Sequence, residues 1–435
     1  MSLIVAKFGG TSLANAAQFR KVHSIIMENP ERRYIVPSAP GKRNSDDYKI
    51  TDLLYLCHAH VNQAISFDEV FNVISNRYLE IISDLGLSLD LKPYLAEIKE
   101  KIAEGASADY VASRGEYLNG IILAKLIGYD FVDPGQVVIF NDRGQLDLEL
   151  AQNNLAKVLA KSPKAVVPGF YGATSTGQVK TFSRGGSDIS GSLVARSVEA
   201  DLYENWTDVS GFLMADPRIV KDSKPMARIT YRELRELAYM GATVLHEESV
   251  FPVRQAGIPI NIKNTNDPGH PGTIIVNEAE SNDSITGIAG KKDFTVIAVE
   301  KEMMNSELGF GRKLLSIMEA NTVSFEHIPT GIDTMSVVIA DSQLNGKLEK
   351  ILEEIRNQCK PDSLEVYPNM ALIATVGRGM VYTPGIAAKL FNALAQSNIN
   401  VRMIDQGSSE LNIIVGVHTT DFEKAVQAIY QAFVH

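Results

Sequence analysis

The stretch "LIVAKFGGTS" (residues 3–12) joins a short apolar segment to a turn that contains a lysine, two glycines and two hydroxyl groups. A buried strand can end in any polar turn, so this composition indicates a more specific purpose. Glycines let backbone N–H groups approach a ligand closely, and a lysine followed by a helix N-terminus favours an anion. The stretch therefore predicts a strand that ends in a phosphate-binding turn at Gly9 and Gly10.

Apolar, strand-like segments alternate with amphipathic helical segments from this stretch to about Asn277. The predicted strands are Leu3–Lys7, Tyr34–Pro37, Phe131–Pro134, Val137–Phe140, Ala165–Pro168 and Asp201–Trp206, and the predicted helices include Asn15–Met27, Thr51–Ile65, Phe67–Asp84, Lys92–Ala103, Tyr110–Leu126 and Ser190–Ala200. This alternation predicts an α/β domain, an open αβα sandwich with a mainly parallel sheet. Ligands of such sheets bind beyond the carboxyl ends of the strands, which is where Gly9 and Gly10 fall.

A different pattern follows the polar segment Glu278–Ser284. The segments "TVIAVEK" (295–301) and "LIATVGR" (372–378) begin two similar copies, each of which reads strand, helix, strand, strand, helix. This order predicts two α+β modules with helices on one face of an antiparallel sheet. Little chain follows the last predicted helix, so we expect the second copy to complete its sheet with Leu364–Pro368. The predicted domains are residues 1–280, 290–368 and 369–435.

Composition limits the class of protein. The chain has 435 residues, of which 45% are hydrophobic, and this size suits about two to three domains. Its net charge is -10 at pH 7 and no Lys/Arg block stands out, which argues against a nucleic-acid partner. Its apolar runs are strand-sized, so we expect no membrane span and a soluble, cytoplasmic protein. Cys57 and Cys359 lack metal-ligand spacing and are expected to be buried thiols.

A second glycine-rich element, "TFSRGGSD" (residues 181–188), repeats the arrangement of the first. It places Gly185 and Gly186 before a predicted helix, with Arg184 as the cation. Neither element is a Walker A loop, and no G-x-G-x-x-G follows the first strand, so P-loop and Rossmann chemistry are disfavoured. Two glycine pairs, each beside a cation and before a helix, favour an anion such as a phosphate.

Two further stretches carry charged residues near predicted element ends. "ASRGEYLNG" (112–120) places Glu116 near the start of an apolar helix face, and "WTDVSGFLMADPRIV" (206–220) follows a strand. Taken alone, each has an ordinary explanation: an acid at the favourable end of a helix dipole, and a turn that Asp216 and Pro217 begin.

Together these stretches resemble a known family. "KFGGTS", "SRGGSD", "TDVSGFLMADPRIV", "MGATVLHEES" and "GIAAKLFNALAQSNINVRMIDQGSSELNIIVGV" look like an aspartokinase of the amino-acid kinase family followed by two ACT domains, in the family's order. The resemblance implies an open αβα kinase fold, ATP and Mg²⁺ as cofactors, and phosphorylation of the β-carboxylate of L-aspartate to 4-phospho-L-aspartate. This reaction would be the first step towards lysine, threonine and methionine.

The resemblance also implies roles for individual residues. Lys7 would meet the transferred phosphoryl group, and Asp188 would orient Lys7. Glu116 would face the substrate ammonium group and Arg184 the α-carboxylate, in a two-pronged contact. The implied ATP contacts are Lys7, Phe8, Gly9, Gly10, Thr207, Asp208 and Arg218, and the implied aspartate contacts are Thr11, Ser38, Thr51, Glu116, Arg184 and Ser187. No protein ligand for Mg²⁺ is expected, because ATP oxygens and water commonly hold this ion.

The chain departs from the family pattern in two places. The charged segment "PGKRNSDDY" (40–48) intervenes before the match to Thr51, and Thr243 stands where relatives commonly carry a nucleotide-contacting lysine. One cation for ATP would then be missing, or Lys263 or another lysine would replace it. His246 follows the family and is interpreted as structural.

Two alternatives remain beside this interpretation. Another amino-acid kinase, acting on glutamate or acetylglutamate, would share the glycine pairs, although the "SRGEYLNG" helix and the twin ACT copies speak against it. A non-catalytic amino-acid sensor would use only the ACT copies, and intact Lys7, Arg184 and Asp188 speak against that.

The resemblance finally implies regulation. The first ACT copy would bind an end-product amino acid, with lysine the leading candidate, at a subunit interface. The residues implied for this effector are Phe310, Ser324, Phe325, Glu326 and Asp333. Because ACT domains generally pair across subunits, we expect a homodimer or a dimer of dimers. We also expect a monofunctional enzyme without a homoserine dehydrogenase part.

Overall fold

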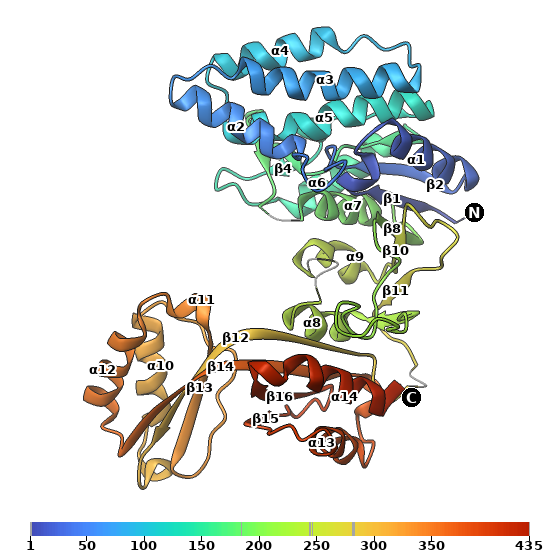
Figure 1. Cartoon of the computed structure of the whole chain (residues 1–435). Helices are drawn as coiled ribbons and strands as arrows, with labels where there is room; N and C mark the ends of the chain where they lie inside the picture. The colour runs from blue at the N-terminus through green and yellow to red at the C-terminus, as the bar shows by residue number, and fades with distance from the viewer. Residues whose placement is uncertain (1, 184, 243–244, 246, 281–282, 435) are drawn as a thin grey trace. The chain divides into compact units, whose positions relative to one another are not determined.

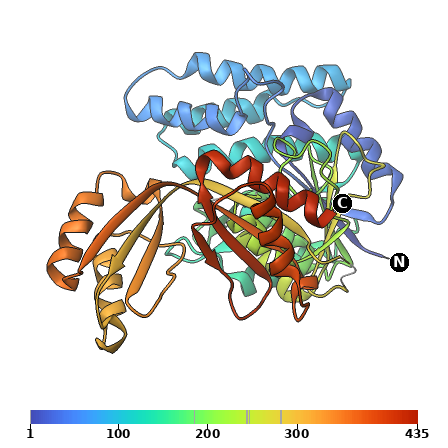
Figure 2. The ribbon, with the colours of Figure 1, turned by 60° about the horizontal axis from the view of Figure 1, so that its bottom comes forward.

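The computed structural model describes residues 2–183, 185–242, 245, 247–280 and 283–434. It divides into two compact units. Unit 1 comprises Met1–Phe212, Pro225–Tyr231 and Val244–Ala279, and unit 2 comprises Leu213–Lys224, Arg232–Thr243 and Glu280–His435. Figures 1 and 2 show the ribbon from two directions.

An eight-stranded sheet forms the centre of the described part of unit 1. In spatial order its strands are β3 (Asp130–Phe131), β5 (Ala165–Val166), β2 (Arg32–Pro37), β1 (Ile4–Phe8), β8 (Leu202–Thr207), β10 (Ile260–Asn264), β11 (Thr273–Val276) and β9 (Arg228–Thr230). All neighbouring pairs are parallel except β10 and β11. The mainly parallel α/β sheet predicted from the sequence is confirmed, and β1 lies in its interior between β2 and β8.

The predicted strand Val137–Phe140 does not join the eight-stranded sheet. Only Ile139–Phe140 (β4) is a strand, and it pairs with β6 (Tyr171–Thr174), which in turn pairs with β7 (Val179–Thr181) in a separate three-stranded sheet. An apolar run alone cannot say which sheet a strand joins, because periodicity carries no information on its partner.

The helices of unit 1 surround the sheet with a buried apolar core. They are α1 (Ala16–Glu28), α2 (Ile50–Asn62), α3 (Asp68–Leu85), α4 (Lys92–Ala103), α5 (Ala108–Ile127), α6 (Leu148–Leu159), α7 (Gly186–Ser197) and α9 (Phe251–Ala256). Asn15 and Ser107 cap the N-termini of α1 and α5 through their side chains, while Gly86 and Gly128 end α3 and α5 in the left-handed conformation. Figure 1 shows α3, α4 and α5 stacked beside one another.

Unit 2 contains a five-stranded antiparallel sheet in its described residues. The spatial order is β13 (Thr334–Ala340), β12 (Gly287–Glu300), β14 (Ser363–Val376), β16 (Asn412–His418) and β15 (Met403–Asp405). The helices are α10 (Phe310–Ala320), α11 (Asp341–Leu344) and α12 (Leu348–Cys359) in the first copy, and α13 (Ile386–Gln396) and α14 (Phe422–Val434) in the second. Each copy has its own apolar core, and Figure 2 shows α10 and α12 side by side.

The long strands β12 and β14 run through both copies (Figure 1). Residues 294–300 of β12 pair with 363–370 of β14, whereas residues 287–291 pair with 372–376. The second copy therefore completes its sheet with Gly287–Lys291, and the prediction that Leu364–Pro368 does so is wrong, because Leu364–Tyr367 pairs with the first copy. The expected boundary between residues 368 and 369 falls inside β14.

Segment 213–224 packs into unit 2 although it follows directly from unit 1 in the chain. The N–H group of Ile288 donates to the carbonyl oxygen of Met214 (2.6 Å), and the N–H group of Lys224 donates to Tyr430 Oη (2.8 Å). Helix α8 (Tyr231–Tyr239) also runs into this unit, where its buried Glu233 pairs with Arg378. The second copy thus holds two pieces of the chain that lie between segments of unit 1 in the sequence.

Candidate active site

Lys7 lies at the carboxyl end of the interior strand β1 and is 8% exposed. Its Nζ is 2.6 Å from Asp188 Oδ1 and 3.4 Å from Asn205 Oδ1. Asn205 is the neighbour of Lys7 in the β1–β8 register, and its Nδ2 donates to Asp188 Oδ1 at 2.8 Å. These three side chains form a closed polar triangle that fixes the ammonium group of Lys7.

Two glycines of the site, Gly10 of the first pair and Gly41 of the loop after β2, leave no room for a side chain. A Cβ on Gly10 would lie 2.9 Å from the carbonyl oxygen of Ala39, and a Cβ on Gly41 would lie 2.7 Å from the carbonyl carbon of Gly10. The N–H group of Gly41 donates to the Gly10 carbonyl oxygen at 2.8 Å. Only glycines allow these two backbone segments to approach so closely. A short 3-10 turn, Gly10–Leu13, begins at the second glycine of the pair, and helix α1 follows from Ala16.

Trp206 of the neighbouring strand β8 packs against the end of β1 and bonds to the turn. Phe8 and Trp206 stack with their ring centroids 5.8 Å apart, and the N–H group of Gly9 donates to the carbonyl oxygen of Trp206 at 2.9 Å. The Nζ of Lys263, the cation suggested as a replacement for a missing lysine, lies 5.1 Å from the centroid of the Trp206 ring.

The second glycine pair starts helix α7. Gly185 adopts the left-handed conformation (φ 58°), and a Cβ on Gly186 would lie 2.5 Å from the Phe170 ring. Asp188 sits in the first turn of α7, where the helix dipole favours a carboxylate. Ser187 packs against Gly169, on which a Cβ would come within 2.7 Å of it. Arg184, Thr243 and His246, which the sequence singled out, lie outside the described residues.

Glu116 is buried in helix α5, with 5% of the residue exposed. Burial raises the pKa of its carboxyl group to about 8, although a hydrogen bond from the backbone N–H group of Ala39 and the charge of Arg114 act in the opposite direction. Its Oε2 has no hydrogen-bond partner within the described part of the chain. An unpaired buried carboxylate is costly, and a ligand ammonium group would relieve that cost.

The other expected aspartate contacts lie around the same segment. Ser38 follows β2, and its N–H group donates to the carbonyl oxygen of Phe8 at 3.0 Å. Thr51 lies in the first turn of α2 and is partly exposed, while Thr11 is exposed in the 3-10 turn. Lys7, Gly10, Ser38 and Glu116 are therefore brought together through the β1 turn and the loop after β2.

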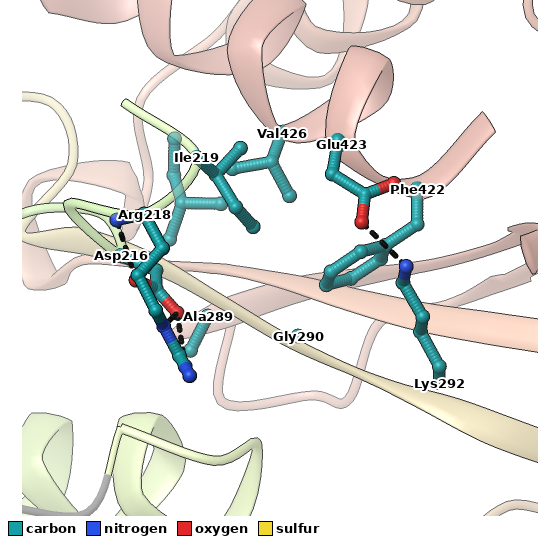
Figure 3. A pocket seen from close by; sticks show the side chains of 10 residues that line it. Asp216, Arg218, Ile219, Ala289, Gly290, Lys292, Phe422, Glu423 and Val426 are labelled. Carbon is teal, nitrogen blue, oxygen red and sulfur yellow. Dashed lines mark hydrogen bonds and ion pairs between the residues drawn. The ribbon is translucent and has the colours of Figure 1, made fainter. Parts of the chain in front are cut away.

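The expected nucleotide contacts belong to both units. Thr207 ends β8 and donates from Oγ1 to the exposed Asp208 at 3.2 Å. Arg218 instead belongs to unit 2, where it pairs with Asp216 at 2.6 Å and its side chain is 88% exposed. Figure 3 shows this pair on one side of a pocket of about 350 Å³, with the Lys292–Glu423 pair on the other.

The residues expected to bind an effector have unequal exposure. Phe310 is 3% exposed and packs in the core of the first copy, so in this arrangement it serves packing. Ser324 and Phe325 are exposed, whereas Glu326 and Asp333 are half-buried.

Sequence reasoning missed two asparagines of this site. Asn205 joins Lys7 to Asp188, and Asn119 donates from Nδ2 to the Ser38 carbonyl oxygen at 2.6 Å. Both are buried. A polar side chain within the apolar strand Leu202–Trp206 was the available signal for Asn205, because buried polar groups need partners.

Comparisons with known proteins identify the family of the chain. The amino acid kinase family matches residues 2–264, and an ACT domain matches residues 373–433. Aspartokinase 3 of Bacillus subtilis is 37% identical over 445 residues, which cover 99% of this chain and 98% of that protein. The chain belongs to the aspartokinase family. The resemblance stated from the sequence is thereby confirmed, together with the amino acid kinase and ACT parts of the fold.

Two solved structures of this family cover the whole chain. A crystal structure of Clostridium acetobutylicum aspartate kinase, described as an allosteric enzyme, has 58% identity and a TM-score of 0.93, and the match covers 100% of both chains. E. coli aspartokinase III in complex with aspartate and ADP has 26% identity and a TM-score of 0.75, again over 100% of both chains. Within the ranges described above, no helix combines the length and apolar character needed to cross a membrane.

Proposed function

We propose that the protein transfers the γ-phosphoryl group of ATP to the β-carboxylate of L-aspartate, giving 4-phospho-L-aspartate and ADP. The observation that carries this proposal is a buried lysine and a buried carboxyl group beside one loop. Lys7 stands beside the glycine turn. The Glu116 carboxyl group accepts a hydrogen bond from the Ala39 N–H group of the neighbouring loop, and its Oε2 has no partner among the described residues. The lysine suits a phosphate, and the carboxyl group of Glu116, once ionised, suits an ammonium group.

The reaction needs no general base, because the ionised β-carboxylate is already the nucleophile. Lys7 would neutralise charge on the transferred group, while the backbone of Gly9 and Gly10 would bind the phosphates. Asp188 and Asn205 hold Lys7 in place, and Asp188 would not attack anything itself. Glu116 would bind the ammonium group, with Arg184 proposed for the α-carboxylate and Thr11, Ser38, Thr51 and Ser187 as further contacts.

The nucleotide is proposed to contact Phe8, Thr207, Asp208 and Arg218 as well. The E. coli relative, crystallised with aspartate and ADP, supports both substrates. Mg²⁺ is proposed to enter with ATP. ATP oxygens and water are its expected ligands, because Mg²⁺ usually keeps several waters and is held with substrate phosphates.

The deciding experiment supplies ATP with L-aspartate, L-glutamate or N-acetylglutamate and traps the acyl phosphate with hydroxylamine. Aspartate-dependent hydroxamate and ADP formation would support the proposal. Preference for glutamate or acetylglutamate would reassign the substrate, and no product with any acid would favour the sensor function.

Regulation is proposed to reside in the two ACT copies. Support comes from the ACT match and from the Clostridium relative, which is described as allosteric. We propose that the effector is lysine, with threonine as the second candidate. It would bind near Ser324, Phe325, Glu326 and Asp333. We further propose a homodimer or dimer of dimers in the cytoplasm that begins the synthesis of lysine, threonine and methionine.

A further inference from the structure

The β2–α2 loop (residues 38–49) contacts both candidate substrate subsites. On one side, its Gly41 N–H group donates to the Gly10 carbonyl oxygen at 2.8 Å. On the other side, the Ala39 N–H group donates to the Glu116 carboxylate, and a Cβ on Gly115 would lie 2.8 Å from the Ala39 Cβ. A shift of this loop would therefore move the phosphate turn and the ammonium site relative to each other.

One side chain from outside the loop holds it. Arg77 of helix α3 is 3% exposed, and its Nη2 donates to both carboxylate oxygens of Asp47, at 2.7 and 2.8 Å. Its Nη1 donates to the carbonyl oxygen of Gly41 at 3.3 Å. Arg77 thus fixes the loop at two points, one of which is the residue that touches Gly10.

The next residue of the same helix contacts helix α5, which carries Glu116. Tyr78 is fully buried, and its hydroxyl group donates to the carbonyl oxygen of Gly115 at 2.8 Å, one residue before Glu116. Two consecutive residues of α3 therefore hold the β2–α2 loop and helix α5, so the same helix positions both candidate subsites.

We propose that Arg77, acting through Asp47 and Gly41, is a positioning residue that sets the distance between the phosphate turn and the amino-acid subsite. This proposal rests on the proposed function, since it concerns the alignment of the same two substrates. Phosphoryl transfer depends mainly on positioning, and a misplacement of about 1 Å can cost about 100-fold in rate. The expected signature is a loss in kcat that exceeds the loss in affinity for either substrate.

The second arginine on Asp47 supplies a matched control. Arg43 Nε donates to Asp47 Oδ2 at 3.0 Å and Arg43 Nη1 lies 3.5 Å from Glu80 Oε2. The Arg43 side chain is 41% exposed, and within the described residues it makes no hydrogen bond to Gly41. Exposed ion pairs contribute little. Losing Arg43 leaves the buried Arg77–Asp47–Gly41 connection intact.

The experiment compares Arg77→Met, Arg77→Lys, Asp47→Asn and the control Arg43→Gln in the full chain. We measure kcat and both KM values, the dissociation constants of ADP and of aspartate by calorimetry, and the melting temperature. Arg77→Met should lower kcat about 10- to 100-fold while each dissociation constant changes less than about threefold. Arg77→Lys keeps the charge without the fork and should recover part of kcat, and Asp47→Asn should lower kcat about 5- to 10-fold. Arg43→Gln should stay within about twofold of wild type.

Each outcome bears on the proposal. A folded Arg77→Met variant with wild-type kcat overturns it, and so does a loss confined to melting temperature. If Arg77→Met does not fold, Asp47→Asn decides, and wild-type kcat in that variant overturns the proposal. Wild-type protein without aspartate phosphorylation overturns the proposed function and this inference together, whereas active wild type with unaffected variants overturns only the inference.

Discussion

The Nζ of Lys7 lies 2.6 Å from Asp188 Oδ1, across two neighbouring structural elements of unit 1, the end of β1 and the first turn of α7. Both side chains are largely buried, so each charge depends on the other for compensation. The pair holds the lysine cation in one position before any nucleotide arrives. Such preorganised charge is the main protein contribution expected in phosphoryl transfer.

Replacing Lys7 tests its proposed role directly. Lys7→Ala should lower kcat about 10²- to 10³-fold, as for the loss of one preorganised charge contact. Aspartate affinity should change much less, because Lys7 is proposed to act on the phosphoryl group. Steady-state kinetics with calorimetry of aspartate provides the measurement. Near-normal turnover in a folded Lys7→Ala enzyme would falsify the role.

Asn205 should matter through Lys7 and Asp188. Asn205→Ala removes a donor to Asp188 and an acceptor for Lys7, so the ion pair loses its lateral support. We expect kcat to fall about tenfold with small changes in either KM, since one buried hydrogen-bonding group is lost. Asn62→Ala, on an exposed position of α2, is the control. Equal kinetics for the two variants would remove Asn205 from the site.

Aspartate binding should depend on pH through Glu116. The pKa of about 8 means that this carboxyl group is mostly protonated at pH 6 in the free enzyme. Binding an ammonium group favours the carboxylate, so the dissociation constant of aspartate should fall up to about tenfold per pH unit between pH 6 and 8 and then level off. Calorimetry across this range is the measurement. Glu116→Gln should flatten the profile, and a flat wild-type profile would contradict the assignment.

The free energy of unfolding should also depend on pH through Glu116, but it should fall as pH rises, whereas aspartate binding strengthens. The folded-state pKa of about 8 lies above the ordinary value of 4.5, so the folded state binds the proton more tightly and loses stability as pH rises through this interval. Relative to Glu116→Gln, the free energy of unfolding of wild type should fall by up to about 1.4 kcal/mol per pH unit between pH 5 and 8. Urea denaturation at pH 5 and pH 8 gives the comparison. A constant difference at both pH values would exclude the buried charge as its cause.

Effector binding is testable by linkage. If lysine inhibits through the ACT copies, saturating aspartate and ADP should weaken lysine binding by the same factor by which lysine weakens theirs. Asp333→Asn should reduce lysine affinity, because a half-buried acid is proposed to meet the cationic ligand. Calorimetry with lysine and then threonine decides the matter. Absence of binding and inhibition by both at millimolar concentration would end the feedback proposal and leave the kinase proposal standing.

Local sequence patterns predicted much of the fold. Helix α4 matches the predicted range Lys92–Ala103, and α1, α3 and β8 differ from prediction by about one residue at each end, because periodicity and caps are local signals. Strand partners are not local. That is why the sequence did not predict that Ile139–Phe140 joins another sheet, or that Gly287–Lys291 completes the second copy.

The candidate site shows the same division. The turns that carry Lys7 and Asp188 were recognisable because they combine glycines, charges and helix starts, whereas Glu116 was singled out only by the family resemblance. Arg77 and Asp47 were not, since 30 residues separate them and their connection depends on the packing of α3. The place of segment 213–224 in unit 2 was not predicted for a similar reason, because its partners Ile288 and Tyr430 are remote in sequence.

The course of β12 has a consequence for how unit 2 is made. Gly287 pairs with Val376, so that part of the sheet can close only after the ribosome has delivered the entire first copy. The pairing of residues 294–300 with β13 spans a much shorter length of chain and should form earlier, because loop closure is less costly and contact order is lower. Until β14 emerges, Gly287–Lys291 presents an unpaired strand edge. Synthesis that stalls at this point would leave a chain prone to pairing with its neighbours.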